Sequence, residues 1–571
     1  MSLNTLDIDD FPVLVSIDFG TTFSGCAYAY IPQDKVPKLI SEWPNQTMYY
    51  AKTPTASLYK KTKGRYEMAE WGCNSKLKKG MPKSENIQLY KFKTYLDENA
   101  DQPPWTSPIT VPDAIADYLK ALHEYVAKEI EQQLGQRCTR ESFRYCLTVP
   151  AMWSDKAKNI MRRAAIQAGI IRENDKPDRL MLVSEPEAAA LYCERSCKEY
   201  DLKHGDRFLI CDAGGGTVDL IVYDIAELTE GRHLSEVTKG HGATCGSMLI
   251  DLNFGNLLIK KFTKQGAKIQ DGVILNLIEK FASALKPQFN GTNELYLELP
   301  WNSFFESIAD PVAIGIDEDT MRFTAAELKE VVFDPVVSKV LELIQDQLDK
   351  AKNCSAIFMV GGFGSSTYLL DCVRRAYGDR VKTISAPNRP EIAVVFGAVY
   401  AGLNPRKVTA RATRRCYGID VLDTFEIGVD PPNLMACRVE GLMCRDRFDT
   451  FVKKGELVKI DECVTRPYSF INQGDSLAKN CKVSIYAIDG DPPRYTTKLR
   501  ESAYISIPRP FTTTDPTGSK VLCIMKFYFG LNEVQVEATV QGQTYITRLQ
   551  FDHGGHANLP RQILYHQARE H

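Results

Sequence analysis

The chain has 571 residues, more than a single hydrophobic core usually supports, so two or three domains are expected. Hydrophobic residues make up 44% and charged residues 25% of the sequence, which is an ordinary globular composition. Lys plus Arg (70) nearly balance Asp plus Glu (72), and the net charge of -2 argues against a protein built to bind nucleic acid or a membrane surface.

The chain opens with an acidic, polar segment, residues 1–10, which lacks the features of a cleavable signal and is expected to be disordered. No apolar stretch approaches about 18 residues, so we expect no membrane span. The 16 cysteines are scattered without zinc-site spacing, a pattern typical of free cysteines in a reducing compartment. We therefore expect a cytoplasmic protein, with the nucleus as the alternative.

Strand and helix signals alternate over residues 11–405. Apolar runs that end in turn residues predict strands at VLVSIDFG, FRYCLTVP, RLMLVSEP, FLICDAGGG and SAIFMVGG. Between them, helices are predicted over 113–134, over 154–168 with Ser154 as N-cap, and after a capping box of Thr324 and Glu327. This alternation predicts an α/β domain with a largely parallel central sheet.

The alternation of strand and helix signals ends near residues 404–416. The polar and basic run from Arg406 to Arg415 (RKVTARATRR) is expected to be a solvated linker. Beyond it, short segments rich in Val, Ile, Tyr and Thr alternate with Gly, Pro and Asp, as in KVSIYAID, SAYISIP, KVLCIMKFYFG, EVQVEATV and TYITRLQF. These segments predict a smaller, antiparallel β-rich domain over residues 406–571.

One pattern occurs twice, in VSIDFGTTFSGCAYAY (15–30) and in LICDAGGGTVDLIVYD (209–224). In each stretch an aspartate, Asp18 or Asp212, ends an apolar strand before a Gly/Thr turn and a second strand. Glycine lets a phosphate approach backbone N–H groups closely. The candidate phosphate-binding residues are Gly20, Thr21, Thr22, Phe23, Gly214, Gly215, Gly216 and Thr217.

Two aspartates beside a polyphosphate are unfavourable unless a divalent cation lies between them. A largely water-coordinated Mg²⁺ fits, so Asp18 and Asp212 are the predicted metal-site residues. Ordinary β-hairpins with glycine turns are the alternative, and the recurrence of the pattern in equivalent strand contexts disfavours it.

These hairpins resemble the two phosphate motifs of the actin, hexokinase and heat-shock ATPase superfamily. Three further segments narrow the resemblance to the seventy-kilodalton heat-shock proteins. They are LTVPAMWSDKAKNIMRRAAIQAG with LVSEPEAAALYC (147–193), IFMVGGFGSSTYLL (357–370) and APNRPEIAVVFGAVYAGL (386–403). The order and spacing agree over about 390 residues, and the resemblance implies a two-lobed, actin-like (ribonuclease H-like) ATPase domain over residues 11–405. The chain is most similar to a divergent, short branch of that family, seen in fungi and animals, without a helical lid.

The resemblance implies roles for individual residues. Asp18 and Asp212 match the aspartates that hold Mg²⁺ through water, and Thr217 matches the threonine near the γ-phosphate. Glu185 matches the glutamate that orients the attacking water, although a first-turn acidic residue at a helix N-terminus is the structural alternative. Lys93 aligns with the catalytic lysine, and Lys91 is the second choice. The residues implied at the nucleoside and ribose are Gly246, Ser247, Lys286, Gly361, Gly362 and Phe363.

Several residues depart from the family pattern. Ser365 stands where an arginine would stack on the adenine, Ser247 replaces a glycine, and the apolar interdomain linker is replaced by NPRKVTARATRRC. Residues 451–458 and 526–542 bear a fainter likeness to the family's peptide-binding β-sandwich. A β-domain without a peptide groove remains the alternative.

The sequence therefore predicts a Mg-ATP-binding and ATP-hydrolysing heat-shock-like chaperone. The partners implied by the resemblance are ATP, unfolded or peptide clients and co-chaperones, with no nucleic acid and no membrane span. Two alternatives stay open. One is a nucleotide-binding interaction or signalling protein with little turnover, and the other is a small-molecule kinase of the same fold.

Overall fold

The computed structural model describes most of the chain. The residues described are 11–47, 49–75, 85–97, 103, 109–135, 138–195, 199–228, 231–267, 270–300, 308–438, 441–472, 479–499, 502–512, 514–549 and 564–566. The predicted disordered segment, residues 1–10, lies outside them.

The first lobe is built on a sheet with the strand order β3-β2-β1-β8-β9, in which β4 also pairs with β2. Its strands are β1 (Val13–Phe19), β2 (Phe23–Tyr30), β3 (Lys38–Ile40), β4 (Thr53–Pro54), β8 (Phe143–Val149) and β9 (Leu180–Ser184). The strands β1, β8 and β9 are parallel, whereas β1 and β2 form an antiparallel hairpin. A smaller sheet holds β5 (Ala56–Thr62), β6 (Arg65–Trp71) and β7 (Asn86–Tyr90).

Two helices of this lobe begin close to where the sequence places them. Helix α1 (Val111–Leu134) has Thr110 as its N-cap, and α2 (Asp155–Gln167) is capped by the predicted Ser154, whose hydroxyl accepts from the backbone N–H of Ala157. The apolar stripe of α1 is buried in the core of the lobe, as its three- and four-residue spacing predicts.

A buried histidine in this core gives the lobe a predictable response to pH. His123 on α1 lies 2.9 Å from the hydroxyl of Tyr145 on β8, and burial, reinforced by Arg140 and Arg179, lowers the pKa of His123 to about 4. Because the pKa is about 6.5 in the unfolded chain, its stabilising contribution is full above that pH and is lost as the pH falls toward 4. The expected loss is about 2 kcal/mol by pH 5. Urea unfolding at pH 7.5 and 5 should show this loss in the wild type and a smaller one in His123→Gln; equal losses would contradict it.

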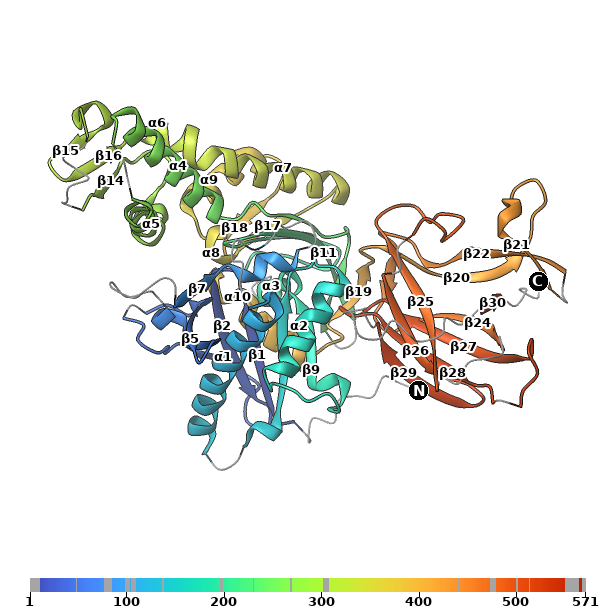
Figure 1. Ribbon diagram of the computed structural model, residues 1–571. Helices are drawn as coiled ribbons and strands as arrows, with labels where there is room; N and C mark the ends of the chain where they lie inside the picture. The colour runs from blue at the N-terminus through green and yellow to red at the C-terminus, as the bar shows by residue number, and fades with distance from the viewer. Residues whose placement is uncertain are drawn as a thin grey trace.

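The second lobe is built on a sheet with the order β18-β17-β10-β11-β12-β19-β23, with β13 paired to β11. Its strands are β10 (Arg207–Ala213), β11 (Val218–Leu228), β12 (Gly231–Glu236), β13 (His241–Ala243), β17 (Ala356–Val360), β18 (Thr383–Ser385), β19 (Val408–Ala412) and β23 (Leu457–Lys459). Helices pack on it: α4 (Met248–Lys264), α5 (Asp271–Lys280), α6 (Ala325–Glu327), α7 (Asp334–Ala351), α8 (Gly361–Gly364) and α9 (Thr367–Tyr377). A small sheet of β14 (Leu295–Glu298), β15 (Ile316–Asp317) and β16 (Thr320–Phe323) lies at its outer end (Figure 1). Thr324 caps α6, as predicted.

Two helices cross where the lobes meet, α3 (Glu185–Glu194) and α10 (Ala393–Leu403). A Cβ atom on Gly397 would fall 1.7 Å from the carbonyl oxygen of Ala188, so this close crossing requires glycine. The hydroxyl of Ser16 in β1 also donates to the carbonyl of Val395, at 2.8 Å. These helices form a buried cluster distinct from the core of either lobe. The predicted two-lobed α/β class is confirmed.

The C-terminal part is almost entirely β-structure with its own core, also as predicted (Figure 1). Its strands are β20 (Cys416–Thr424), β21 (Met435–Arg438), β22 (Gly441–Val452), β24 (Val464–Ile471), β25 (Asn480–Ile488), β26 (Ala503–Pro508), β27 (Lys520–Tyr528), β28 (Gln535–Val540), β29 (Gln543–Arg548) and β30 (Leu564–His566). Their pairings are antiparallel apart from that of β20 with β30.

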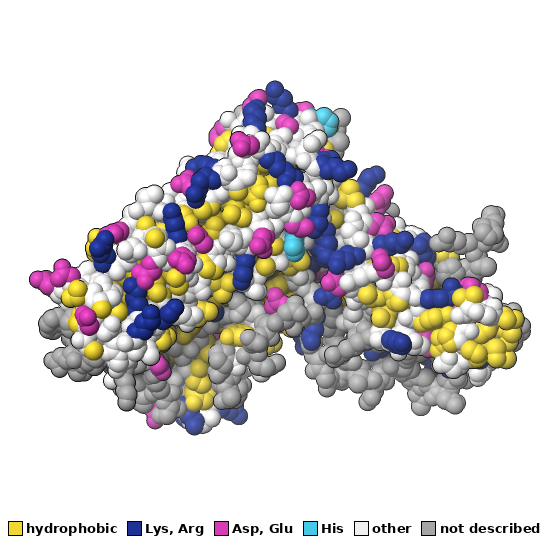
Figure 2. Space-filling view, turned by 90° about the horizontal axis from the view of Figure 1, so that it is seen from above, with side chains coloured by type: hydrophobic (Ala, Val, Ile, Leu, Met, Phe, Trp, Pro, Cys, Tyr) yellow, Lys and Arg dark blue, Asp and Glu magenta, His cyan; other side chains and the backbone are white. Residues whose placement is uncertain are grey.

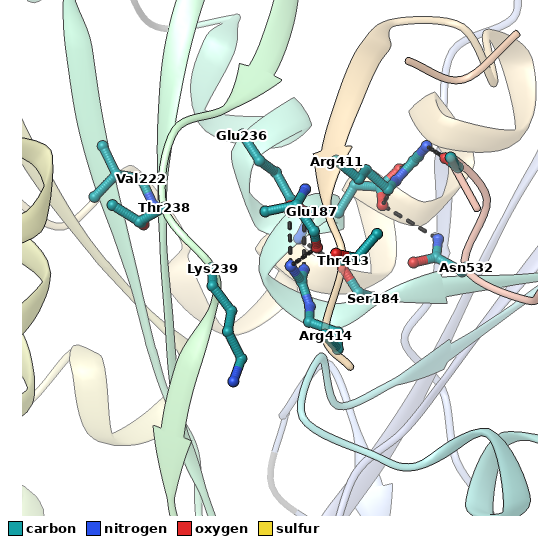
Figure 3. Close-up of polar contacts among 12 residues, drawn as sticks. Ser184, Glu187, Val222, Glu236, Thr238, Lys239, Arg411, Thr413, Arg414 and Asn532 are labelled. Atoms are coloured by element: carbon teal, nitrogen blue, oxygen red, sulfur yellow. Dashed lines mark hydrogen bonds and ion pairs between the residues drawn. The ribbon is translucent and has the colours of Figure 1, made fainter. Parts of the chain in front are cut away.

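The expectation of a solvated linker over residues 406–415 is wrong for its central residues. Strand β19 pairs with β12 of the second lobe and with β23, which comes from the β-rich part. Arg411 is only 7% exposed and forms a bidentate ion pair with Glu187 of α3, while Arg414 pairs with Glu236 at 2.9 Å (Figure 3). The arginines are buried because each meets a carboxylate, which offsets the cost of removing its charge from water.

Further polar contacts join the β-rich part to the two α/β lobes. The side chain of Asn532 donates to Glu187 at 3.2 Å, and Arg162 of α2 pairs with Glu533 at 2.6 Å. Tyr417 donates to Asp155 at the start of α2, at 2.5 Å. The β-rich part therefore rests on α2 and α3 of the two α/β lobes.

Lys and Arg side chains lie among Asp and Glu side chains over the face shown in Figure 2. Within the described residues, no helix combines the length and apolar character needed to cross a membrane.

Candidate functional site

The two aspartates of the repeated pattern stand at equivalent positions of two hairpins. Asp18 faces Gly25 across the β1–β2 pair, and Asp212 faces Asp219 across the β10–β11 pair. Both carboxylates are largely buried, with Asp18 4% and Asp212 7% exposed. Each lies at or near the end of a strand, just before a glycine-containing turn, as predicted.

The two turns, one from each lobe, contact each other. A Cβ atom on Gly215 would lie 2.6 Å from the side chain of Thr22, and one on Gly216 would lie 2.8 Å from the hydroxyl of Thr21. Glycine is therefore required where the second turn touches the first. The structure brings together residues nearly 200 positions apart that the sequence assigned to one phosphate site.

Asp18 has two hydrogen-bond partners, neither of which was predicted. The ammonium group of Lys52 lies 2.6 Å from Asp18 Oδ2, and the hydroxyl of Thr148 on β8 donates to Oδ1 at 2.9 Å. Burial lowers the pKa of Lys52, but Asp18, Tyr50 and Asp212 together outweigh burial, so the pKa lies above its usual value. Lys52 is thus a cation of the site.

Lys93 lies against Glu185 at the centre of the cluster. The Lys93 ammonium is 2.5 Å from Glu185 Oε1 and 5.2 Å from the centre of the Trp153 ring, and the residue is 2% exposed. It belongs to the 3-10 helix η2 (Phe92–Leu96). The second choice, Lys91, precedes η2 in a left-handed conformation (φ 61°), and its nearest charges are Asp251 and Lys286. The geometry therefore favours Lys93 over Lys91.

The carboxylates of the site repel one another. Burial raises the pKa of Glu185, opposed by Lys93 and reinforced by Asp18. Burial, then Glu185, Asp219 and Asp18, raises the pKa of Asp212 well above its usual range. Asp219 is affected in the same way: burial and Glu185 raise its pKa to about 7.

This excess of negative charge fits a cation such as Mg²⁺, which would relieve the repulsion. Among the described residues, no three His, Cys, Asp or Glu side chains converge closely enough to ligate an ion directly. Asp18 and Asp212 are placed to hold the water ligands of such an ion.

The start of helix α4 is docked on the second turn. The backbone N–H groups of Gly246 and Ser247 donate to the carbonyls of Gly216 and Gly214, both at 3.1 Å. Lys286 lies 2.8 Å from Asp251 of α4 and 3.5 Å from the hydroxyl of Ser247. Gly246 and Ser247, predicted near the ribose, and Lys286, predicted near the adenine, therefore belong to one group of neighbouring residues.

The glycine pair after β17 lies against the other side of Asp212. Gly361 has a φ of 81°, and a Cβ atom there would fall 2.7 Å from Asp212 Oδ1. Gly362 is near the hydroxyl of Tyr50, which comes from the first lobe. Phe363 was also predicted at the nucleoside, but its side chain lies in the core of the second lobe. Phe23, by contrast, is 40% exposed and packs edge-to-face on Tyr50.

Four residues of the site carried no recognised role in the sequence: Tyr50, Lys52, Thr148 and Trp153. Thr148 and Trp153 lie within the recognised LTVPAMW segment, so the motif carried a signal for both. Tyr50 and Lys52 lie in YYAKTP, which has no glycine pattern or periodicity to mark it.

Two facing glycine hairpins, one from each lobe, define the actin-like class of nucleotide-binding proteins. The Hsp70 protein family model matches residues 112–407, which is more than half of the chain, and the chain belongs to the Hsp70 family. Membership implies nucleotide binding. The matched range contains Glu185 and Asp212 but begins after Asp18, Lys52 and Lys93.

Similar proteins align with this chain over most of its length. Human heat shock 70 kDa protein 12A is 26% identical over 547 residues, covering 82% of this chain and 80% of its own length. The mouse protein of the same name is 26% identical over 540 residues and covers 80% and 79%. Human heat shock 70 kDa protein 12B is 25% identical over 570 residues and covers 85% and 82%. The chain is a divergent relative of these proteins.

Proposed function

We propose that this protein binds Mg-ATP and hydrolyses it to ADP and phosphate. The observation that carries the proposal is the meeting of the two turns, Thr21 and Thr22 against Gly215 and Gly216, beside a buried cluster of carboxylates and lysines. Such a cluster has no evident use in a packed core, where it costs free energy. It suits the binding of a polyphosphate and a cation.

The roles proposed for the residues follow from their positions. Bound Mg²⁺ would supply positive charge to the polyphosphate, with its waters held by Asp18 and Asp212. The hydroxyls of Thr21, Thr22 and Thr217 would donate to phosphate oxygens. Lys93 would neutralise charge on the transferred phosphoryl group, and Glu185, held by Lys93, would accept a hydrogen bond from the attacking water.

The chaperone part of the proposal concerns residues 406–571, which we take as a second domain following the ATPase domain, 11–405. Its support is the contact of the β-rich part with α2 and α3, and the heat-shock names of similar proteins. Client peptides and co-chaperones are the proposed partners, and the cytoplasm or nucleus is the proposed location. Low turnover with a signalling role, or transfer of phosphate to a small molecule, are the alternatives.

Replacing Asp212 with asparagine is expected to lower ATP hydrolysis by about 10- to 100-fold, because the variant loses the charge that holds the metal-bound water. Phosphate release by the purified chain in excess Mg²⁺ measures this effect. Asp224→Asn is the matched control, since Asp224 lies at the far end of the same hairpin and is 35% exposed.

Three outcomes separate the functions. Equal rates of ATP hydrolysis in the wild type and in Asp212→Asn would contradict the assignment of the site. Hydrolysis that an unfolded peptide neither stimulates nor inhibits would remove the chaperone part and leave the ATPase. Transfer of the labelled γ-phosphate to a sugar or a carboxylate instead of water would favour the kinase.

A further inference from the structure

Lys52 lies beside the first hairpin. It directly precedes β4, whose residues Thr53 and Pro54 pair with Ser24 and Phe23 at the beginning of β2. Because β2 begins immediately after the predicted phosphate turn, this pairing fixes the backbone of Lys52 close to that turn. The position of Lys52 is therefore fixed by strand pairing directly after it.

Side chains of the same segment hold the backbone that leads to Lys52. The amide of Gln46 donates to the carbonyl of Tyr50 at 2.9 Å, and the indole N–H of Trp43 donates to the carbonyl of Ala51 at 3.4 Å. Trp43 and Ala51 are both buried. The two residues before Lys52 are therefore anchored to the first lobe.

A glycine makes room for the Lys52 side chain. Gly25 lies directly opposite Asp18 in the β1–β2 pair, and a Cβ atom on Gly25 would fall 2.8 Å from Cγ of Lys52 and 3.5 Å from its Cδ and Cε. Any other residue at this position would displace the middle of the side chain. The hairpin thus provides a channel along which Lys52 reaches Asp18.

The charged end of Lys52 lies among the carboxylates of the site. Its Nζ atom is 2.6 Å from Asp18, and its charge also acts on Glu185 and Asp212. The lysine side chain is 13% exposed. A cation of the chain itself therefore stands where bound polyphosphate meets Asp18 and Asp212, the place at which the sequence alone called for a divalent ion.

We propose that Lys52 is a phosphate-binding residue that allows this protein to bind ATP with a reduced requirement for a divalent cation, an inference that rests on the proposed nucleotide site. An ammonium group has three N–H donors, so Lys52 binds Asp18 and phosphate oxygens at the same time. It screens the polyphosphate from Asp18 when no metal is bound. Lys93, which is engaged by Glu185, acts at the other side of the cluster.

The test is the affinity of the full chain for ATP, measured by isothermal titration calorimetry in excess Mg²⁺ and in excess EDTA. The quantity of interest is the ratio of the two dissociation constants. In Lys52→Met this ratio should exceed that of the wild type by about 10- to 100-fold, because a charge-assisted hydrogen bond matters most when no metal is present. Lys61→Met, at an exposed position of β5, should keep the wild-type ratio.

A second variant tests the same role of Lys52 in case Lys52→Met does not fold. Gly25→Ala keeps the lysine and its charge but displaces the side chain from its channel, so its ratio should also rise. Lys52→Arg retains the charge and should remain nearer the wild type than Lys52→Met. Ratios in Lys52→Met and Gly25→Ala that equal the wild-type ratio would overturn the proposal.

Failure of the inference and failure of the proposed function give different results. Wild-type protein that binds ATP in Mg²⁺ but loses all detectable binding in EDTA refutes the role of Lys52 and leaves the nucleotide site intact. Wild-type protein that binds ATP in neither condition refutes both.

Discussion

Replacing Lys93 with methionine is expected to lower the free energy of unfolding by about 3–5 kcal/mol, because Glu185 then keeps its buried charge without a partner. The same change should lower ATP hydrolysis by about 100- to 1,000-fold, since it removes a fixed positive charge from the transferred phosphoryl group. Chemical denaturation measures the first effect and single-turnover phosphate release measures the second. Lys91→Met is the matched control.

A double variant tests whether the loss of stability in Lys93→Met comes from the unpaired charge of Glu185. Glu185→Gln combined with Lys93→Met removes both charges, so most of the lost stability should return, as when a buried ion pair is replaced by neutral groups. Hydrolysis should stay low. Low hydrolysis is expected because the double variant also lacks the carboxylate proposed to bind the attacking water. Recovery of hydrolysis together with stability would show that neither Lys93 nor Glu185 is needed for hydrolysis, and a larger loss of activity in Lys91→Met would reassign the lysine.

The sequence predicted those parts of the site that are specified by short, local sequence patterns. An aspartate at the end of an apolar strand, followed by glycine and threonine, defines a hairpin within about 16 residues, and both predicted strand pairs are present. The N-caps Ser154 and Thr324 are local in the same sense, since each hydroxyl accepts a backbone N–H three residues on. The facing of the two turns was inferred from the repetition of the pattern and from the resemblance, because no pattern within either hairpin specifies its partner.

The parts that the sequence did not predict depend on contacts between distant segments. Lys52 meets Asp18 across 34 positions, and Arg411 meets Glu187 across 224. A lysine or an arginine is most often exposed, so only the position of its carboxylate partner shows that it is buried. The expectation of a solvated linker over residues 406–415 was wrong for this reason. A basic segment is compatible with solvent exposure and equally with burial against acidic side chains.

The Arg411–Glu187 pair links the β-rich part to the nucleotide site by a short path. Glu187 lies on α3 two residues after Glu185, and it also accepts a hydrogen bond from Asn532. Arg411 donates to the carbonyl of Gly530 as well. One buried ion pair therefore joins the helix that carries Glu185, the strand β19 and the loop of residues 529–534.

Replacing Arg411 with methionine is expected to release β19 from the second lobe, because Glu187 then remains buried without its cation. The cost should be about 3–5 kcal/mol, which corresponds to a fall of roughly 100-fold or more in the hydrogen-exchange protection of β19. The amide of Ala412, which donates to Glu236 at 2.9 Å, is a direct reporter of this opening.

The matched control for Arg411→Met is Arg406→Met, since Arg406 belongs to the same segment but its pair with Asp461 is exposed, at 50% and 55%. An exposed pair contributes less than about 1 kcal/mol, so protection of β19 should hardly change. Adding Glu187→Gln to Arg411→Met should recover part of the lost protection, because it removes the unpaired charge. Equal protection in the Arg411 and Arg406 variants would show that backbone pairing of β19 with β12 and β23, rather than the buried ion pair, holds the two parts of the chain together.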